Sequence, residues 1–262
     1  MMMNSNRYLS LAGLVGAALL TACSFEKNAV QEIAGPAPST GVKFFNFGVG
    51  APGVNFYAND IKMTAISSTT GIESTNGVTY GNAGAGALYT GINPAAYTLA
   101  GKIAAATDKD LVISNVSATL ADGKYYSYYQ SGIYNTTAKT VDAFIVEDPI
   151  PALDFSKAYV RFVNAISNAQ PTVLTITPTT AGTGSPVAIG GAIAYKSAGE
   201  FVGVPGDISY TLSARVAGSA TDLVTRTGIT FATGRVYTIT ARGSATVATG
   251  TNAPFLDNTA NR

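Results

Sequence analysis

The chain has 262 residues, of which 47% are hydrophobic and only 12% are charged, so it can bury a sizeable core. Its 16 Lys and Arg nearly balance its 15 Asp and Glu, and the absence of any basic run argues against nucleic acid as a partner. It contains no His and only 1 Cys, which excludes His-based catalytic relays, an intrachain disulfide and a cysteine-rich zinc site.

Residues 1–22 have the three parts of a secretory signal. Arg7 gives charge to a short polar start, and the apolar stretch 9–20 is too short to cross a bilayer comfortably as a permanent helix. The run Leu20–Ala22 before Cys23 resembles the bacterial lipobox. This resemblance implies cleavage before Cys23, acylation of its thiol and stable anchoring in a membrane. The alternative is an ordinary signal peptide that happens to contain a cysteine.

Residues 23–40 form the next segment, which consists of the lipidated Cys23 and a tether. The tether is polar and rich in small residues, and it ends in the run Gly35–Thr40, so we expect it to be flexible. Ser24, rather than Asp, follows the cysteine, which by resemblance to enterobacterial sorting favours the outer membrane. The periplasmic and the cell-surface face both stay open.

The remaining sequence repeats itself in order, which indicates a duplicated domain. The run Val42–Phe47 returns as Val160–Ala165, Tyr97–Ala100 as Tyr210–Ser213, and Gly123–Tyr126 as Gly234–Tyr237, with lags of 118, 113 and 111 residues. We therefore expect module 1 over 41–148, a short stiff linker over 149–157, module 2 over 158–250 and a loose polar tail over 251–262.

Both modules are expected to be all-β, because short runs of β-branched and aromatic residues alternate with turns rich in Gly, Pro, Asn and Asp. Outside the signal, no stretch shows a convincing helical period. This pattern predicts two tandem immunoglobulin-like β-sandwiches. The expected strands are 54–58, 98–103, 111–116 and 141–146 in the first copy, and 173–177, 210–216, 223–227 and 236–241 in the second.

Several of these motifs are similar to those of the bacterial domain-of-unknown-function 4397 family. They include Val160–Ala165, Val204–Gly206 followed by Tyr210–Leu212, and Gly234–Tyr237 in the second copy, with Val42–Asn46 and Val54–Asp60 in the first. The resemblance covers most of residues 41–245. It implies paired β-sandwich modules in exported, often lipid-anchored proteins with no agreed activity. The first copy departs from the family at Asn93–Ala96, where Pro-Ala-Gly is usual.

The tyrosine-rich run Tyr125–Tyr129 is the main candidate site. Strand alternation puts Tyr125 and Tyr129 on one face, where they could form an exposed aromatic platform for sugar or peptide. The competing interpretation is that tyrosine is simply a favoured strand residue. Tyr126 corresponds to Tyr237, and both follow a Gly-x-x pattern at a strand start, which resembles a tyrosine corner with a structural role.

Other polar positions favour structural or solvated roles. Asn46 and Asn164 recur at a strand end, where the amide can bond the backbone of the following turn or contact a ligand. Asp108 and Asp110 could offer oxygens to calcium, although two carboxylates on a polar loop are more often solvated. The same interpretation applies to the pair Glu147–Asp148.

Three functions remain in view. The leading hypothesis is a lipid-anchored, non-enzymatic cell-envelope protein without cofactor or metal, whose modules serve structure or recognise an envelope protein or glycan. The second is a carbohydrate- or polymer-binding module in nutrient capture or adhesion. The third is an enzyme that uses carboxylates alone, which requires two acids about 5–10 Å apart in a cleft.

Overall fold

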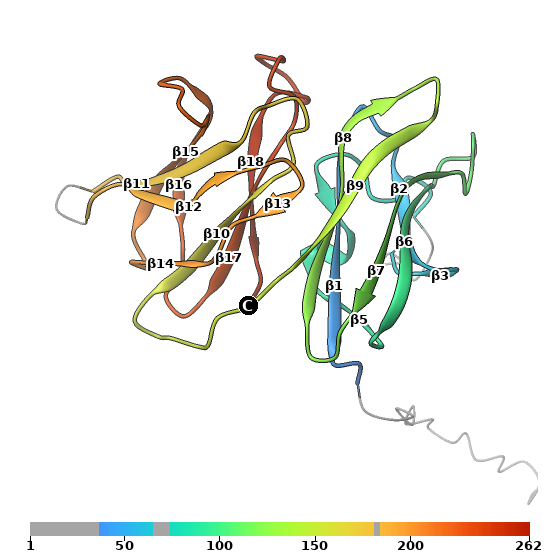
Figure 1. Cartoon of the computed structure of the whole chain (residues 1–262), viewed down its shortest axis with the longest axis horizontal. Helices are drawn as coiled ribbons and strands as arrows, with labels where there is room; N and C mark the ends of the chain where they lie inside the picture. Colours follow the sequence, from blue (N-terminus) through green and yellow to red (C-terminus); the bar gives the residue numbers. More distant parts are fainter. Residues whose placement is uncertain (1–36, 65–73, 181–183) are drawn as a thin grey trace, which may run out of the picture. The chain divides into compact units, whose positions relative to one another are not determined.

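A computed structural model describes residues 37–64, 74–180 and 184–262 of the protein (Figure 1). Cys23, the signal and most of the tether lie outside these residues. Within the described residues, no helix is long and apolar enough to cross a membrane. Residues 38–262 form one unit by their contacts, and this unit contains two β-sandwiches, as expected.

The first sandwich is built from two sheets. One has the strand order β4-β1-β8-β9 with β5 also paired to β1, and the other has the order β3-β2-β6-β7. A 3₁₀ turn, η1 (Gly84–Ala87), follows β4. The strands are β1 (Thr40–Val49), β2 (Val54–Ala58), β3 (Ile61–Lys62), β4 (Asn82–Ala83), β5 (Thr90–Ile92), β6 (Ala95–Ile103), β7 (Val112–Leu120), β8 (Tyr125–Asn135) and β9 (Thr140–Glu147).

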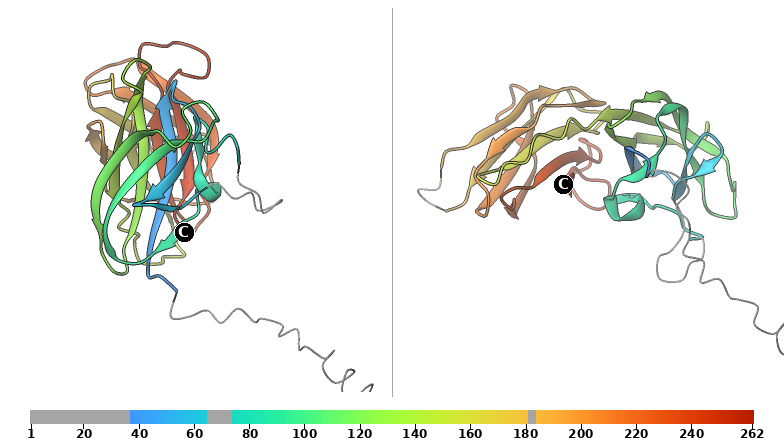
Figure 2. Two further views of the ribbon diagram at one scale, coloured as in Figure 1. Left: turned by 90° about the vertical axis from the view of Figure 1, so that its right-hand side faces the viewer. Right: turned by 90° about the horizontal axis from the view of Figure 1, so that it is seen from below.

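The second sandwich repeats this plan. One sheet has the order β13-β10-β17-β18 with β14 also paired to β10, and the other has the order β12-β11-β15-β16. Two further views show the layers of each sandwich (Figure 2). The strands are β10 (Ala158–Asn164), β11 (Thr172–Pro178), β12 (Val187–Ile193), β13 (Ser197–Ala198), β14 (Val202–Val204), β15 (Ser209–Val216), β16 (Asp222–Thr230), β17 (Val236–Arg242) and β18 (Phe255–Ala260).

All of the strands expected from the sequence are present, and the strand order adds a feature that the repeats did not reveal. The first strand of each sandwich lies inside its sheet and runs parallel to a later strand, β1 beside β8 and β10 beside β17. The other ladders are antiparallel. The sandwich architecture is therefore confirmed, with a parallel pair at the centre of one sheet in each module.

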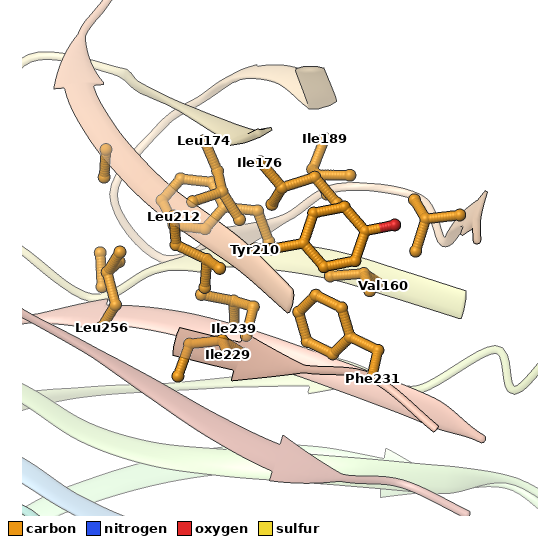
Figure 3. Close-up of a cluster of buried hydrophobic side chains, with 14 of the residues drawn as sticks. Val160, Leu174, Ile176, Ile189, Tyr210, Leu212, Ile229, Phe231, Ile239 and Leu256 are labelled. Carbon is orange, nitrogen blue, oxygen red and sulfur yellow. The ribbon is translucent and has the colours of Figure 1, made fainter. Parts of the chain in front are cut away.

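Each sandwich has its own apolar core between its two sheets. In the second module the core includes Tyr210, whose ring lies tilted against that of Phe231 with centroids 5.6 Å apart, among branched aliphatic side chains (Figure 3). In the first module, Phe44 of β1 packs on Phe56 of β2 with ring centroids 5.3 Å apart. Burial of these side chains from water is the main force that holds each pair of sheets together.

Strand β1 is buried along its whole length because both of its faces are covered. Val42 and Phe44 face the core of their own module, whereas Phe45 and Phe47 belong to a separate apolar cluster that includes Val163 of module 2. A strand covered on both sides has no need of alternating polar residues, which explains the nearly continuous apolar run in this part of the sequence.

The sequence repeats occupy equivalent places in the two modules. The hydroxyl of Tyr126 accepts a hydrogen bond from the Ala121 N–H at 3.1 Å, and that of Tyr237 accepts one from the Ala232 N–H at 3.1 Å. Both tyrosines thus bond the backbone five residues upstream, as a tyrosine corner does. The predicted structural role of this pair is confirmed.

The predicted loose tail over 251–262 is wrong, and module 2 extends beyond residue 250. Residues 255–260 form β18, which pairs antiparallel with β17 along its length. Leu256 is fully buried, and the carboxylate of Asp257 accepts a hydrogen bond from Arg242 Nε at 2.5 Å. The composition of the run does not reveal this strand, because polar side chains such as Asp257 and Thr259 bond other residues of the protein instead of water.

Candidate functional site

The candidate site lies where the sheets containing β1 and β10 meet. Its centre is a buried ion pair between Arg161 of β10 and Asp148, the residue after β9. The side chains of this pair are 1% and 0% exposed. Buried charges of this kind persist only when they are paired and hydrogen-bonded.

All three nitrogens of the Arg161 guanidinium and both oxygens of Asp148 take part in hydrogen bonds. Arg161 donates from Nε to Thr238 Oγ1 at 3.0 Å and from Nη1 to the Glu147 carbonyl at 2.9 Å. Asp148 Oδ2 accepts from Ser127 Oγ at 2.8 Å and from the Tyr89 hydroxyl at 2.6 Å. The charge-assisted bonds offset the cost of removing the two charges from water.

The network continues from Tyr89 into module 2. Asn261 Nδ2 donates to the Tyr89 hydroxyl at 2.7 Å, and Thr238 Oγ1 donates to Asn261 Oδ1 at 2.8 Å. Burial and the neighbouring carboxylate of Asp148 raise the pKa of Tyr89, so its hydroxyl stays protonated and acts as a donor. A closed chain of polar groups therefore links the two modules.

Lys43 adds a second buried cation. It is 1% exposed, its Nζ donates to the Ala260 carbonyl at 2.5 Å, and it lies 4.4 Å from the centre of the Tyr89 ring. Burial lowers the pKa of Lys43 to about 8, with Asp148 acting in the opposite direction and Arg161 adding to the decrease. Two basic side chains thus share the surroundings of one carboxylate.

The contacts across this interface come in equivalent pairs. In module 1, Val42 pairs with Tyr126, which pairs with Glu147. In module 2, Val160 pairs in the same way with Tyr237, which pairs with Ala260. Glu147 is therefore equivalent to Ala260, and Lys43, which follows Val42, is equivalent to Arg161. In each module the cation donates to the carbonyl at the matching place in the other module. By the same register, Asp148 matches Asn261 and Ser127 matches Thr238. The interface is therefore pseudo-symmetric, but module 1 has the carboxylate of Asp148 where module 2 has the amide of Asn261.

A cavity of about 460 Å³ opens beside this network. Tyr125, which is 38% exposed, lines the cavity, and the centre of its ring lies 4.8 Å from that of Tyr89. Lys124 and Glu147 form an exposed ion pair of 2.9 Å at the cavity, and Asn261 also lines it. An aromatic wall with a few polar groups is a common form of ligand pocket.

The two tyrosines predicted to form an exposed platform lie in different surroundings. Tyr125 lines the cavity, but Tyr129 is fully buried, stacked 4.8 Å from Phe45 and 5.0 Å from Phe144. The expectation of a shared surface platform is therefore corrected, because module 2 covers the face of β8 on which Tyr129 lies. Only Tyr125 remains a candidate for ligand contact.

The two asparagines are bonded to backbone, as favoured from the sequence. Asn46 Nδ2 donates to the Val78 carbonyl at 2.9 Å, and its Oδ1 accepts from the Gly48 N–H at 3.3 Å. Asn164 Nδ2 donates to the Ile193 carbonyl at 3.0 Å, and its Oδ1 accepts from the Ile166 N–H at 3.0 Å. Both are fully buried and hold the bend after their strand.

The acidic candidates differ from each other. Both oxygens of Asp108 lie 2.7 Å from Lys139 Nζ. Across residues 37–64, 74–180 and 184–262, no three His, Cys, Asp or Glu side chains gather in a way that could hold a metal ion. The expectation that Asp148 is solvated is wrong, because it is buried against Arg161. Sequence reasoning missed this pair, although the equivalence of Lys43 and Arg161 in the repeat marked a basic residue within an apolar strand.

Comparisons with known proteins identify one family. The family model described as Domain of unknown function (DUF4397) matches residues 40–175, just over half of the chain. No curated protein matches. Among solved structures, wild-type pneumolysin is similar over 59% of this chain and 31% of its own, with 11% sequence identity and a TM-score of 0.24, which is too low to carry an argument. On the strength of the family match, the chain belongs to the DUF4397 family.

Proposed function

We propose that the protein is a lipid-anchored cell-envelope protein whose two non-catalytic β-sandwich modules have a structural or recognition role. The lipobox-like run before Cys23 supports the anchor, and Ser24 after it favours the outer membrane. The resemblance of the sequence to exported, often lipid-anchored members of the family points the same way. The face of the membrane on which the modules stand is left open by this proposal.

The second sandwich is, in this proposal, a second copy of the same family module. The family match ends at residue 175, soon after module 2 begins. Support for the second copy comes from its matching strand order and from the tyrosine corners of Tyr126 and Tyr237. The matching asparagines Asn46 and Asn164 also support it.

The observation that carries the non-catalytic part of the proposal is the closed network around Asp148. Its two oxygens accept from Arg161, Ser127 and Tyr89, and the bond from Arg161 joins the modules. A catalytic carboxylate must instead have an oxygen free to exchange a proton with substrate. The charges of the site thus serve to hold two recognition modules as one body.

The anchor is tested by phase partition of the full chain in a membrane-solubilising detergent that separates on warming. We expect the wild-type chain in the detergent phase and the Cys23→Ser chain in the aqueous phase, because only the former carries acyl chains. Wild-type chain in the aqueous phase would refute the anchor. The Ser variant keeps the size of the side chain and so serves as the matched control.

A second candidate function, glycan binding, is favoured by the position of Tyr125. Its partly exposed ring forms a wall of the cavity beside Lys124, Glu147 and Asn261, which offer donors and acceptors to hydroxyl groups. Sugars are commonly bound by such a combination of an aromatic face and polar side chains. The site would then recognise a neutral glycan of the cell envelope.

Glycan binding is tested on an array of bacterial polysaccharides. We expect Tyr125→Ala to weaken binding roughly tenfold, whereas Tyr125→Phe keeps the ring and most of the affinity. Ile133→Ala, at the far end of β8, is the control that leaves binding unchanged. Silence of the wild-type chain on the array would reject this candidate, and cleavage of a bound glycan would reject the non-catalytic proposal.

A further inference from the structure

The linker between β9 and β10 exposes two large apolar side chains. Leu153 is 53% exposed and Phe155 is 77% exposed, the highest value among the large hydrophobic residues that the structure describes. Asp154 Oδ1 accepts from the backbone N–H of Ser156 at 2.8 Å and from its hydroxyl at 2.6 Å. This turn fixes the local backbone and leaves the residues on either side of Asp154 facing outward.

Single exposed apolar residues are common and need no explanation. This pair differs because it lies in a stretch, residues 149–155, whose only ionisable side chain is Asp154. Asp154 itself accepts a hydrogen bond from Ser156 and forms an ion pair with Lys157. Phe155 gains little cover from its own module, since it lies against Gly234, which has no side chain. The linker therefore presents an apolar tip that the described part of the chain leaves largely uncovered.

The tip lies at the end of the molecule where the chain enters the first sandwich. Gly41 of β1 pairs with Tyr125 of β8, and the N–H of Asp148 donates to the Tyr125 carbonyl at 2.7 Å, so the linker leaves β9 beside the start of β1 (Figure 1). The linker enters β10 at the same end, where the Gly234 N–H donates to the Lys157 carbonyl at 2.9 Å.

The sequence between Cys23 and this end is short. Thirteen residues, 24–36, separate Cys23 from the described part of the chain, and they can span at most about 47 Å. A chain anchored at Cys23 therefore holds the linker within reach of the bilayer at a high effective concentration. Under these conditions even a weak affinity for lipid is sufficient for contact.

We infer that Leu153 and Phe155 insert into the interfacial layer of the bilayer to which the protein is anchored. The inference rests on the proposed anchor at Cys23. Phe and Leu are side chains that commonly enter the boundary between headgroups and acyl chains. The linker is thus a second, non-covalent membrane contact that orients the cavity and the modules on the membrane.

The charges at this end indicate which lipids the contact requires. Exposed or half-buried basic and acidic residues are equal in number at this end, so there is no net attraction to anionic headgroups. Insertion is therefore driven by the apolar side chains and needs no anionic lipid. The basic residues are Lys124, Lys157, Arg235 and Arg262, and the acidic ones are Asp122, Glu147, Asp154 and Asp207.

The chain contains no tryptophan, so a single introduced one reports on its own surroundings. We would compare Phe155→Trp with Ile133→Trp, each in the full lipidated chain on vesicles of neutral phosphatidylcholine with or without brominated acyl chains. Ile133 is 54% exposed and pairs with Val49, at the end of β1 away from the linker. It is therefore an exposed control position at the opposite end of the strand.

We expect brominated lipid to reduce the emission of the Phe155→Trp chain by roughly half and to leave that of the Ile133→Trp chain unchanged. Brominated lipid that reduces the emission of both chains by the same fraction, or of neither, would overturn the inference. It would also be overturned by a blue shift of the Phe155→Trp chain that occurs in detergent, without vesicles, and grows with protein concentration, since a second copy would then cover the tip.

Flotation of the vesicles separates failure of the anchor from failure of the inference. A chain that floats with the vesicles but shows no quenching keeps its anchor and refutes the membrane contact. A chain with Cys23 intact that does not float refutes the anchor and, with it, the contact that depends on the anchor. Leu153→Ser combined with Phe155→Ser leaves flotation unchanged, because the acyl chains dominate binding.

Discussion

Replacing Asp148 by Asn tests whether the buried network holds the modules together. Asn has nearly the same shape and is the residue found at the equivalent position, Asn261, so the change removes a charge with little loss of volume. It leaves the buried cations Arg161 and Lys43 without a counter-charge. Removing one partner of a buried pair costs about 3–5 kcal/mol, which for a chain of this size lowers Tm by roughly 6–20 °C.

Urea unfolding followed by circular dichroism and tyrosine fluorescence measures this cost. The neighbouring change Glu147→Gln is the control, because it breaks an exposed ion pair with Lys124 and should alter the free energy of unfolding by no more than about 0.5 kcal/mol. Adding Arg161→Met to Asp148→Asn should restore most of the lost stability, since no arginine then lies buried without its partner. A loss below about 1 kcal/mol for Asp148→Asn, or a double variant less stable than either single one, would refute the reasoning.

Four further variants test the remaining structural conclusions. Because burial lowers the pKa of Lys43 to about 8, the unfolded chain binds more protons than the folded chain above that pH. The free energy of unfolding should therefore rise by about 2 kcal/mol between about pH 7 and pH 9.5. Urea titrations of the Lys43→Met chain should show no such rise. Buried tyrosines such as Tyr129, whose pKa burial raises to about 12, act in the opposite direction only above about pH 10. Tyr126→Phe and Tyr237→Phe each remove one hydrogen bond to the backbone and should each cost about 1 kcal/mol in thermal unfolding, and unequal losses would speak against equivalent corners. Asn164→Ala leaves the Ile166 N–H and the Ile193 carbonyl without their partner and should cost about 1–3 kcal/mol, and an unchanged Tm would contradict the structural role.

Much of the fold could be predicted because local chemistry decides it. The motif Gly123–Tyr126 and its repeat combine a residue with positive φ, at +68° for Gly123 and +78° for Gly234, with a tyrosine that bonds the preceding turn. Such features depend on neighbours a few residues away. The strand positions and the bends after Asn46 and Asn164 were predictable for the same reason.

Contacts between the modules could not be predicted, because they depend on residues far apart in the sequence. Tyr129 and Tyr128 lie on opposite faces of β8. Nothing in the tyrosine run itself shows that module 2 covers the face on which Tyr129 lies. The burial of Asp148 depends on Arg161, and that of residues 255–260 depends on pairing with β17. Polar residues in such places resemble solvated ones until their partners are known.

The most direct test of the proposed function is metabolic labelling with an alkyne analogue of palmitate in a bacterial host, followed by coupling of the purified chain to a fluorescent azide. The wild-type chain should carry the label and the Cys23→Ser chain should not, while both fold to the same β-rich spectrum. An unlabelled wild-type chain would contradict the proposal that this protein works as a membrane-anchored pair of modules.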